Sequence, residues 1–417
     1  MKNSFALRLG FGAIAMTVAA ASASAQTPEG RWDATLKVGS TVIPFRLDVS
    51  GSGPGLKGTL YNGEDKEFTT DASFKNGKLV LNLEHYLTKI VADFKDGQLD
   101  GKIQMRGDKG PEGSEFHASR HVDGDNAGAN VPNIAGSWVI PHESPKGEKA
   151  WRLIVKQNGA EATATVLRVD GDTGALTGSW KNGKFVVSHF DGSRPGLLEI
   201  IPNADGSLRL LQRGSNRDGE LLAYRAEVAS AKGIPAPADY TTHTTARDAK
   251  EIFAYKLPDL AGKVRSNDDS QFKDKVVLAI VTGTWCPNCH DEAQYLVELY
   301  NKYHDKGLEI VALDFEEPEQ LEDPTRVRAF IKQYKVPYTY LIGGAPAEMW
   351  EKVPQLVNLN TWPATVFVRK DGRVDHIHSG FAAPASGEFN AQLKQEFTST
   401  IERLLAEKAP VVSASVR

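Results

Sequence analysis

The sequence of 417 residues predicts a multidomain chain: two tandem all-β repeats, each a small antiparallel barrel or sandwich, followed by an α/β domain. The tripeptide Gly-Arg-Trp at residues 30–32 returns as Gly-Ser-Trp at residues 136–138. The segment FKNGKLV at residues 74–80 returns as WKNGKFV, again 106 residues later. One offset shared by two separated motifs favours duplication over chance. From about Phe253 the pattern changes to alternating strands and helices.

Each repeat is expected to consist of short strands joined by tight turns. Apolar and polar residues alternate at 45–49 and 78–83, which is typical of strands with one buried face. Asn-Gly and Asp-Gly pairs indicate hairpin turns, because both central positions of such turns need positive φ. These pairs are Asn62-Gly63, Asn76-Gly77, Asp96-Gly97, Asn182-Gly183 and Asp205-Gly206.

Turns about ten residues apart suit a small barrel or sandwich. The Gly-x-Trp opening resembles the first-strand motif of lipocalin-like barrels, so we favour a barrel. We place the repeats at residues 27–121 and 134–228, and a linker containing Pro and Thr at residues 229–246.

The first 25 residues predict a cleaved export signal. Lys2 and Arg8 precede an apolar run at residues 9–21, and Ala-Ser-Ala at residues 23–25 fits a cleavage site. The run is shorter than the roughly 20 residues that a membrane span needs. Removal would leave 417 − 25 = 392 residues with a net charge of −4 − 2 = −6. We therefore expect a periplasmic or otherwise exported protein with no transmembrane segment after cleavage, and the charge disfavours nucleic acid as a partner.

The last domain, placed at residues 247–408, is expected to be a mixed sheet with helices on both faces. Its predicted order is β-α-β-α-β-β-α. The strands are at residues 276–282, 308–313, 364–369 and 373–378, and the helices are at residues 286–304, 324–334 and 388–405.

The only two cysteines of the chain, Cys286 and Cys289, lie three residues apart at the turn from the first strand to the first helix of this domain. An exported protein that uses its only cysteines in one short-range pair does not use them as a structural staple. The positive end of the helix favours a thiolate at Cys286. We therefore expect Cys286 to attack from the exposed helix start and Cys289, one turn deeper, to resolve the mixed disulfide. Zinc is disfavoured because no second cysteine pair exists, and no cofactor is expected.

Four motifs of this domain resemble the thioredoxin superfamily, and within it the TlpA/ResA branch of bacterial exported thiol–disulfide oxidoreductases. They are Phe253 with Leu-Pro-Asp-Leu at residues 257–260, Trp-Cys-Pro-Asn-Cys at residues 285–289, Glu292, and Trp-Pro-Ala-Thr at residues 362–365. The resemblance covers about residues 250–408 and implies a thioredoxin-like fold and a protein disulfide reductase with a redox-active disulfide. It also implies disulfide-bearing exported proteins as clients, apocytochrome c among them, and a membrane electron donor.

The resemblance further assigns roles around the cysteines. Pro363 is expected to follow a cis peptide bond, so that the backbone of Trp362 can pair with an extended client chain. Trp285 is expected to form a wall beside the nucleophilic sulfur, with an ordinary core aromatic as the alternative. Glu292 is expected near the cysteines as a proton-transfer group, with a solvated glutamate of the first helical turns as the alternative.

Two other functions remain open from the sequence. The β repeats could bind a ligand or the envelope, with the redox domain as an accessory. A thiol peroxidase is the other alternative, but its Pro-x-x-x-Thr-x-x-Cys motif would need Pro at the position of Ala279 and Thr at that of Gly283. The acidic run at residues 314–317 is expected to be a solvated loop.

Overall fold

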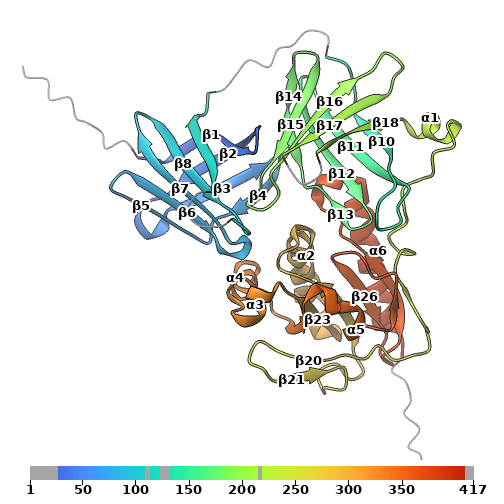
Figure 1. The fold of residues 1–417 in the computed structure, drawn as a ribbon. Coiled ribbons are helices and arrows are strands. Elements are labelled where there is room, and N and C mark those ends of the chain that lie inside the picture. The colour runs from blue at the N-terminus through green and yellow to red at the C-terminus, as the bar shows by residue number, and fades with distance from the viewer. Residues whose placement is uncertain (1–26, 109–112, 123–130, 215–217, 409–417) are drawn as a thin grey trace, which may run out of the picture.

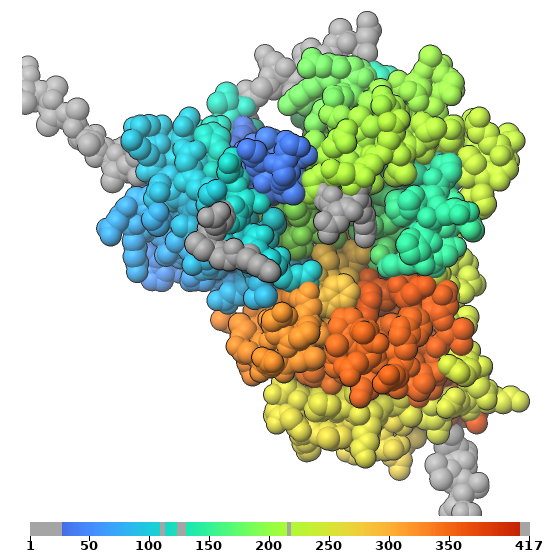
Figure 2. Space-filling view, viewed as in Figure 1, coloured from blue at the N-terminus to red at the C-terminus, as the bar shows by residue number. Residues whose placement is uncertain are grey.

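The computed structural model describes residues 27–108, 113–122, 131–214 and 218–408; the predicted signal at residues 1–25 lies outside these ranges. The described chain forms two β units and one α/β domain, and both β units lie on the same side of that domain (Figure 1). Figure 2 shows both β units in contact with the orange and red part of the α/β domain. Among the described residues, no helix has the length and apolar character that crossing a membrane requires.

The first β unit is one antiparallel sheet of nine strands in the order β4-β3-β2-β1-β9-β8-β7-β6-β5. Its strands are β1 (Gly30–Val38), β2 (Thr41–Ser50), β3 (Lys57–Asn62), β4 (Asp65–Phe68), β5 (Asp71–Lys75), β6 (Lys78–Leu83), β7 (Thr88–Lys95), β8 (Gln98–Gln104) and β9 (Ser114–Arg120). Alternate residues such as Leu47 and Leu81 point into a single core. The short helix η2 (Glu84–Tyr86) links β6 to β7 and lies against the α/β domain.

The second β unit is also one antiparallel sheet, in the order β10-β11-β12-β14-β15-β16-β17-β18, with β13 paired to β12. Its strands are β10 (Gly136–Pro141), β11 (Ala150–Asn158), β12 (Glu161–Arg168), β13 (Gly171–Asp172), β14 (Leu176–Lys181), β15 (Lys184–His189), β16 (Gly196–Pro202), β17 (Leu208–Arg213) and β18 (Gly219–Ala223). A bridge between Val139 and Tyr224 joins the two ends of this sheet. Each unit is one sheet around one core, which makes it a half-barrel or barrel rather than a two-sheet sandwich and agrees with the alternative favoured from the sequence.

The Gly-x-Trp motif makes the same local contacts in both β units. The indole Nε1 of Trp32 donates to the backbone oxygen four residues earlier at 2.8 Å, and that of Trp138 does the same at 3.0 Å. Arg120 lies over the ring of Trp32 at 4.0 Å, and Arg225 lies over Trp138 at 3.8 Å. In each unit the tryptophan is buried in the core and an arginine from the last part of the unit lies over its ring.

The α/β domain has a five-stranded sheet in the order β24-β23-β22-β26-β27. These strands are β24 (Thr339–Gly344), β23 (Leu308–Phe315), β22 (Val276–Thr282), β26 (Ala364–Val368) and β27 (Val374–Ser379). The first three are parallel to one another, and β26 and β27 are antiparallel to their neighbours. The shorter strands are β19 (Thr245–Ala246) with β25 (Leu356–Val357), and β20 (Lys256–Pro258) with β21 (Val264–Ser266).

The helices of this domain pack mainly on one face of the sheet. They are α2 (Pro287–Tyr303), α4 (Thr325–Tyr334) and α6 (Glu388–Ala406), and they share one apolar core. The other face is covered by the segment 253–272 and the four-residue helix α5 (Met349–Lys352). The short helices α1 (Ala226–Ala231) and α3 (Pro318–Glu322) lie outside this core.

The predicted order of this domain was wrong in one respect. Strand β24 was not predicted, although its aromatic and β-branched residues follow Pro337 as a strand often follows a proline. The expectation of helices on both faces holds, but unevenly, because the second face has only the four-residue helix α5 beside extended segments.

Candidate redox site

The two cysteines lie where β22 passes into α2, as the sequence predicts. Cys286 is the N-cap residue of α2, and its carbonyl accepts the backbone N–H groups of Cys289 at 3.0 Å and His290 at 3.3 Å. Both thiols are free. The Sγ of Cys286 donates to the carbonyl oxygen of Trp362 at 3.4 Å, and the peptide bond from Trp362 to Pro363 is cis, which confirms that prediction.

The expected exposure of Cys286 was wrong. Cys286 is 5% exposed and Cys289 is 2% exposed. The rings of Trp285 and Trp362 meet edge to face beside the sulfur, with centroids 5.2 Å apart. The Nε1 of Trp285 donates to the carbonyl of Phe315 at 2.9 Å, which fixes the orientation of this ring.

Glu292 is buried in the α/β domain, which contradicts the solvated alternative. Its side chain follows Cys289 by one turn and is 1% exposed. Thr365 donates its hydroxyl to Oε1 at 2.5 Å, and Oε2 has no hydrogen-bond partner. Burial raises the pKa of Glu292 to about 8, against the opposing hydrogen bond from Thr365, so this carboxyl is mostly neutral at pH 7.

Cys289 and Glu292 share the same internal surroundings. Both line a void of about 10 Å³, together with Thr282. Burial and the neighbouring Cys286 raise the pKa of the Cys289 thiol well above its usual value. Cys289 therefore stays protonated at neutral pH unless its proton is taken by a nearby group.

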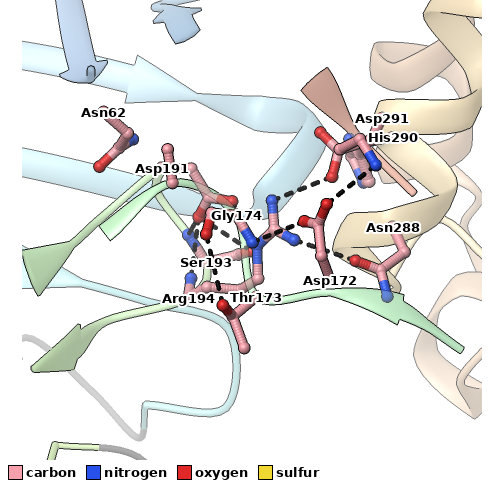
Figure 3. Close-up of polar contacts among 12 residues, drawn as sticks. Asn62, Asp172, Thr173, Gly174, Asp191, Ser193, Arg194, Asn288, His290 and Asp291 are labelled. Carbon is pink, nitrogen blue, oxygen red and sulfur yellow. Dashed lines mark hydrogen bonds and ion pairs between the residues drawn. The ribbon is translucent and has the colours of Figure 1, made fainter. Parts of the chain in front are cut away.

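The second β unit contacts Asn288, one of the two residues between the cysteines, and no sequence motif predicts this contact. The Nδ2 of Asn288 donates to the carbonyl of Asp170 at 2.7 Å, in the turn between β12 and β13. The Oδ1 of Asn288 accepts from Nη1 of Arg194 at 3.1 Å, and Nη2 of the same arginine contacts Asp291 at 3.2 Å (Figure 3). Arg194 follows β15 and is oriented by Asp191, which accepts from its Nε at 2.7 Å.

The first β unit contacts the residue after the second cysteine. Tyr86 of η2 stacks on the imidazole of His290, with centroids 4.1 Å apart and planes at 22°. Nε2 of His290 donates to the carbonyl of Thr284 at 2.7 Å, and Nδ1 accepts from the hydroxyl of Tyr334 at 2.9 Å. Burial lowers the pKa of His290 well below its usual value, in agreement with this neutral tautomer. Arg106 of the same unit reaches the carbonyl of Trp285 at 3.5 Å.

The acidic run at residues 314–317 overlaps the end of β23, and Asp314 and Glu316 are buried rather than part of a solvated loop as expected, whereas Glu317 is partly exposed. The Oε1 of Glu316 accepts from both the backbone N–H and the hydroxyl of Thr284, each at 2.6 Å. The fully buried guanidinium of Arg326 neutralises Glu316. Burial and the nearby Glu316 raise the pKa of Asp314 well above its usual value. This cluster fixes the backbone of Thr284, two residues before the nucleophile.

Comparison with known proteins gives a family match within the α/β domain. Residues 249–377 match the AhpC/TSA family, which leaves both β units outside the match. The chain is 35% identical over 127 residues to thiol-disulfide oxidoreductase ResA of Bacillus thuringiensis subsp. konkukian, over 30% of this chain and 65% of that protein. It is 25% identical over 141 residues to ResA of Halalkalibacterium halodurans, over 34% of this chain and 73% of that protein. The chain thus spans about 65% of the length of the first of these relatives.

Solved structures also match this part of the chain. A secreted thiol-disulfide isomerase from Corynebacterium glutamicum matches 39% of this chain and 92% of its own, at 16% identity and a TM-score of 0.31. A thiol-disulfide oxidoreductase from Bacteroides fragilis matches 35% of this chain and 99% of its own, at 15% identity and a TM-score of 0.28. The family match and the curated relatives confirm the resemblance predicted from the sequence for the C-terminal domain, which is thioredoxin-like.

Proposed function

We propose that this protein is an exported thiol–disulfide oxidoreductase that reduces disulfides of other exported proteins. One observation carries the proposal: Cys286 caps the N-terminus of α2 and its sulfur contacts the carbonyl of Trp362, next to Pro363. The helix N-terminus stabilises a thiolate at that position. An extended client chain that pairs with the backbone at Trp362 would bring its own disulfide to the same sulfur.

The reaction is a pair of thiol–disulfide exchanges. The thiolate of Cys286 attacks one sulfur of the client disulfide, that bond breaks, and the other client sulfur leaves as a thiolate that takes up a proton. Cys289 then loses its proton and attacks the sulfur of Cys286, which releases the second client thiolate and leaves a Cys286–Cys289 disulfide. Two electrons and two protons pass to the client in one cycle. Glu292, which lines the same void as Cys289, is the group proposed to exchange the Cys289 proton.

The proposal also covers the direction of electron flow, from a membrane donor to the client, and the class of client. Relatives named thiol-disulfide oxidoreductase support the reaction class. A reductant in an oxidising compartment must be re-reduced after each cycle, and a membrane electron donor would do this. Apocytochrome c, whose cysteines must be free before haem attachment, is one client class.

The test is reduction of insulin by the full chain with dithiothreitol as the electron source. We expect Cys286→Ser to abolish the catalysed rate. We expect Cys289→Ser, reduced beforehand and freed of dithiothreitol, to retain the attack on insulin but to accumulate the mixed disulfide, which mass spectrometry detects. A catalysed rate that survives Cys286→Ser would overturn the proposal.

The family match also raises the question of peroxide reduction, and the site argues against it. A peroxidatic motif needs a hydroxyl side chain three residues before the nucleophile, where this chain has Gly283. A Cβ at Gly283 would lie 2.3 Å from Nε1 of Trp285 and 2.8 Å from the carbonyl of Phe315, so a threonine does not fit there. Consumption of hydrogen peroxide faster than the turnover of a disulfide client would favour the peroxidase.

A further inference from the structure

We propose that Arg194, in the second β unit, is a positioning residue of the redox pair: it holds Asn288 between the two cysteines and thereby shifts the equilibrium between dithiol and disulfide. The inference builds on the proposed function, because it needs a pair that cycles. It adds a task for the β units, which lie outside the matched family domain.

The contacts leave Arg194 and Asn288 little freedom. Each of the three guanidinium nitrogens of Arg194 has an acceptor: Nε contacts Asp191, Nη1 contacts Asn288 and Nη2 contacts Asp291. The amide of Asn288 is bonded at both ends, by Arg194 at its oxygen and by the carbonyl of Asp170 at its nitrogen. A flip of this amide would turn its NH₂ group toward the guanidinium of Arg194 and its oxygen toward the carbonyl of Asp170. Neither contact is a hydrogen bond, so the orientation of the amide is fixed.

The backbone of Asn288 lies inside the turn that joins the two sulfurs. The carbonyl of Cys286 accepts from the N–H of Cys289 across this turn. A disulfide requires a narrow range of distances and dihedral angles between its two residues. A turn held in one geometry therefore changes the free energy of the disulfide relative to the dithiol, and the side chain that holds it contributes to the reduction potential.

The charge of Arg194 gives the expected direction. Its guanidinium is partly buried, 19% exposed, and lies on the first turn of α2. A positive charge near the helix start favours the thiolate form of a cysteine. Removal of Arg194 would leave Asp191 and Asp291 without this cation, so the thiolate and with it the reduced pair would become less stable. We expect the pair to become harder to reduce.

The experiment is the equilibrium of the full-length protein with reduced and oxidised glutathione, read by alkylation and mass spectrometry. We expect Arg194→Gln to shift the equilibrium constant three- to tenfold toward the disulfide, where tenfold corresponds to about 30 mV for a two-electron couple. The matched control is Arg209→Gln in the same β unit, whose exposed side chain pairs with Glu220. We expect this control to leave the equilibrium constant unchanged.

Two further variants separate positioning from a general loss of structure. Asn288→Ala removes the contact but keeps the charge of Arg194, so it should also change the equilibrium constant, and the double variant with Arg194→Gln should shift it by less than the sum of the two single shifts. If circular dichroism shows that Arg194→Gln does not fold, the equilibrium is measured for Arg194→Lys instead. Lysine keeps the charge but lacks the planar guanidinium group, so we expect a smaller shift of the same sign.

The outcomes distinguish the two proposals. A wild-type protein that forms no Cys286–Cys289 disulfide in glutathione buffers would overturn the proposed function itself. A wild-type pair that equilibrates normally, with folded Arg194 variants within twofold of it, would overturn only the inference on Arg194. Additive shifts of Arg194→Gln and Asn288→Ala would show that the arginine does not act through the asparagine.

Discussion

Replacing Glu292 with glutamine tests the buried acid beside Cys289. Burial raises the pKa of this carboxyl from 4.5 to about 8 in the folded protein. At a pH between these two pKa values, Glu292 keeps its proton in the folded protein but has lost it in the unfolded chain. The contribution of this protonated group to stability is therefore complete below about pH 4.5 and is lost as the pH rises toward 8. Glutamine has the shape of the neutral carboxyl and does not ionise, so the variant escapes this loss.

The size of the effect follows from the interval between the two pKa values. The interval from 4.5 to about 8 spans about 3.5 pH units, and each unit corresponds to about 1.4 kcal/mol. Most of this range lies between pH 5 and 8. We therefore expect the free energy of unfolding of Glu292→Gln, relative to the wild type, to increase by about 3–4 kcal/mol between these two pH values.

Unfolding of the reduced protein in guanidinium chloride, followed by thiol labelling at pH 5, 6.5 and 8, measures this difference. Both cysteines of the chain lie in the α/β domain, so labelling reports the unfolding of that domain and not of the β units. The control is Glu298→Gln on the same helix, whose side chain is 67% exposed and should give no such trend. A difference between wild type and Glu292→Gln that stays constant across the pH range would refute the argument.

Two further substitutions test the contacts between the units. Tyr86→Ala removes the ring that stacks on His290, and we expect alkylation of Cys286 by iodoacetamide at fixed pH to become several-fold faster; an unchanged rate would mean that this contact does not cover the site. Asn62→Ala removes two hydrogen bonds to the backbone of Phe190 that join the β units, of 3.1 and 3.0 Å. Because this substitution leaves buried backbone groups unpaired, we expect the free energy of unfolding, measured by thermal unfolding, to fall by about 1–3 kcal/mol. A decrease below about 0.5 kcal/mol would contradict this expectation.

The local elements of the α/β domain could be predicted because their signals are local. The apolar run of β22 and the helical period of α2 appear in consecutive residues, and the Trp-Pro-Ala-Thr motif indicated the cis bond before Pro363. Asn-Gly and Asp-Gly pairs located hairpin turns of the β units for the same reason. All five glycines of these pairs adopt positive φ, and so do three of the residues before them, Asn76, Asp96 and Asn182.

The environment of the site could not be predicted, because it depends on contacts between distant segments. The prediction that Cys286 is exposed was made from the helix start alone, whereas its sulfur lies against the carbonyl of Trp362, 76 residues later in the chain. Glu316 was expected in solvent because its neutralising partner, Arg326, lies on the next long helix. No spacing rule links Arg194 to Asn288 across 94 residues of chain.

The positions of the two β units follow from the geometry of a helix start. Asn288, His290 and Asp291 lie in the first turn of α2, and successive residues of a helix point about 100° apart. The three side chains therefore point in different directions from the start of the helix. The second unit contacts Asn288 and Asp291, and the first contacts His290 through Tyr86. We infer that two similar β units serve here because the turn that carries the cysteines has two sides to hold, so that displacement of either unit would alter the surroundings of the redox pair.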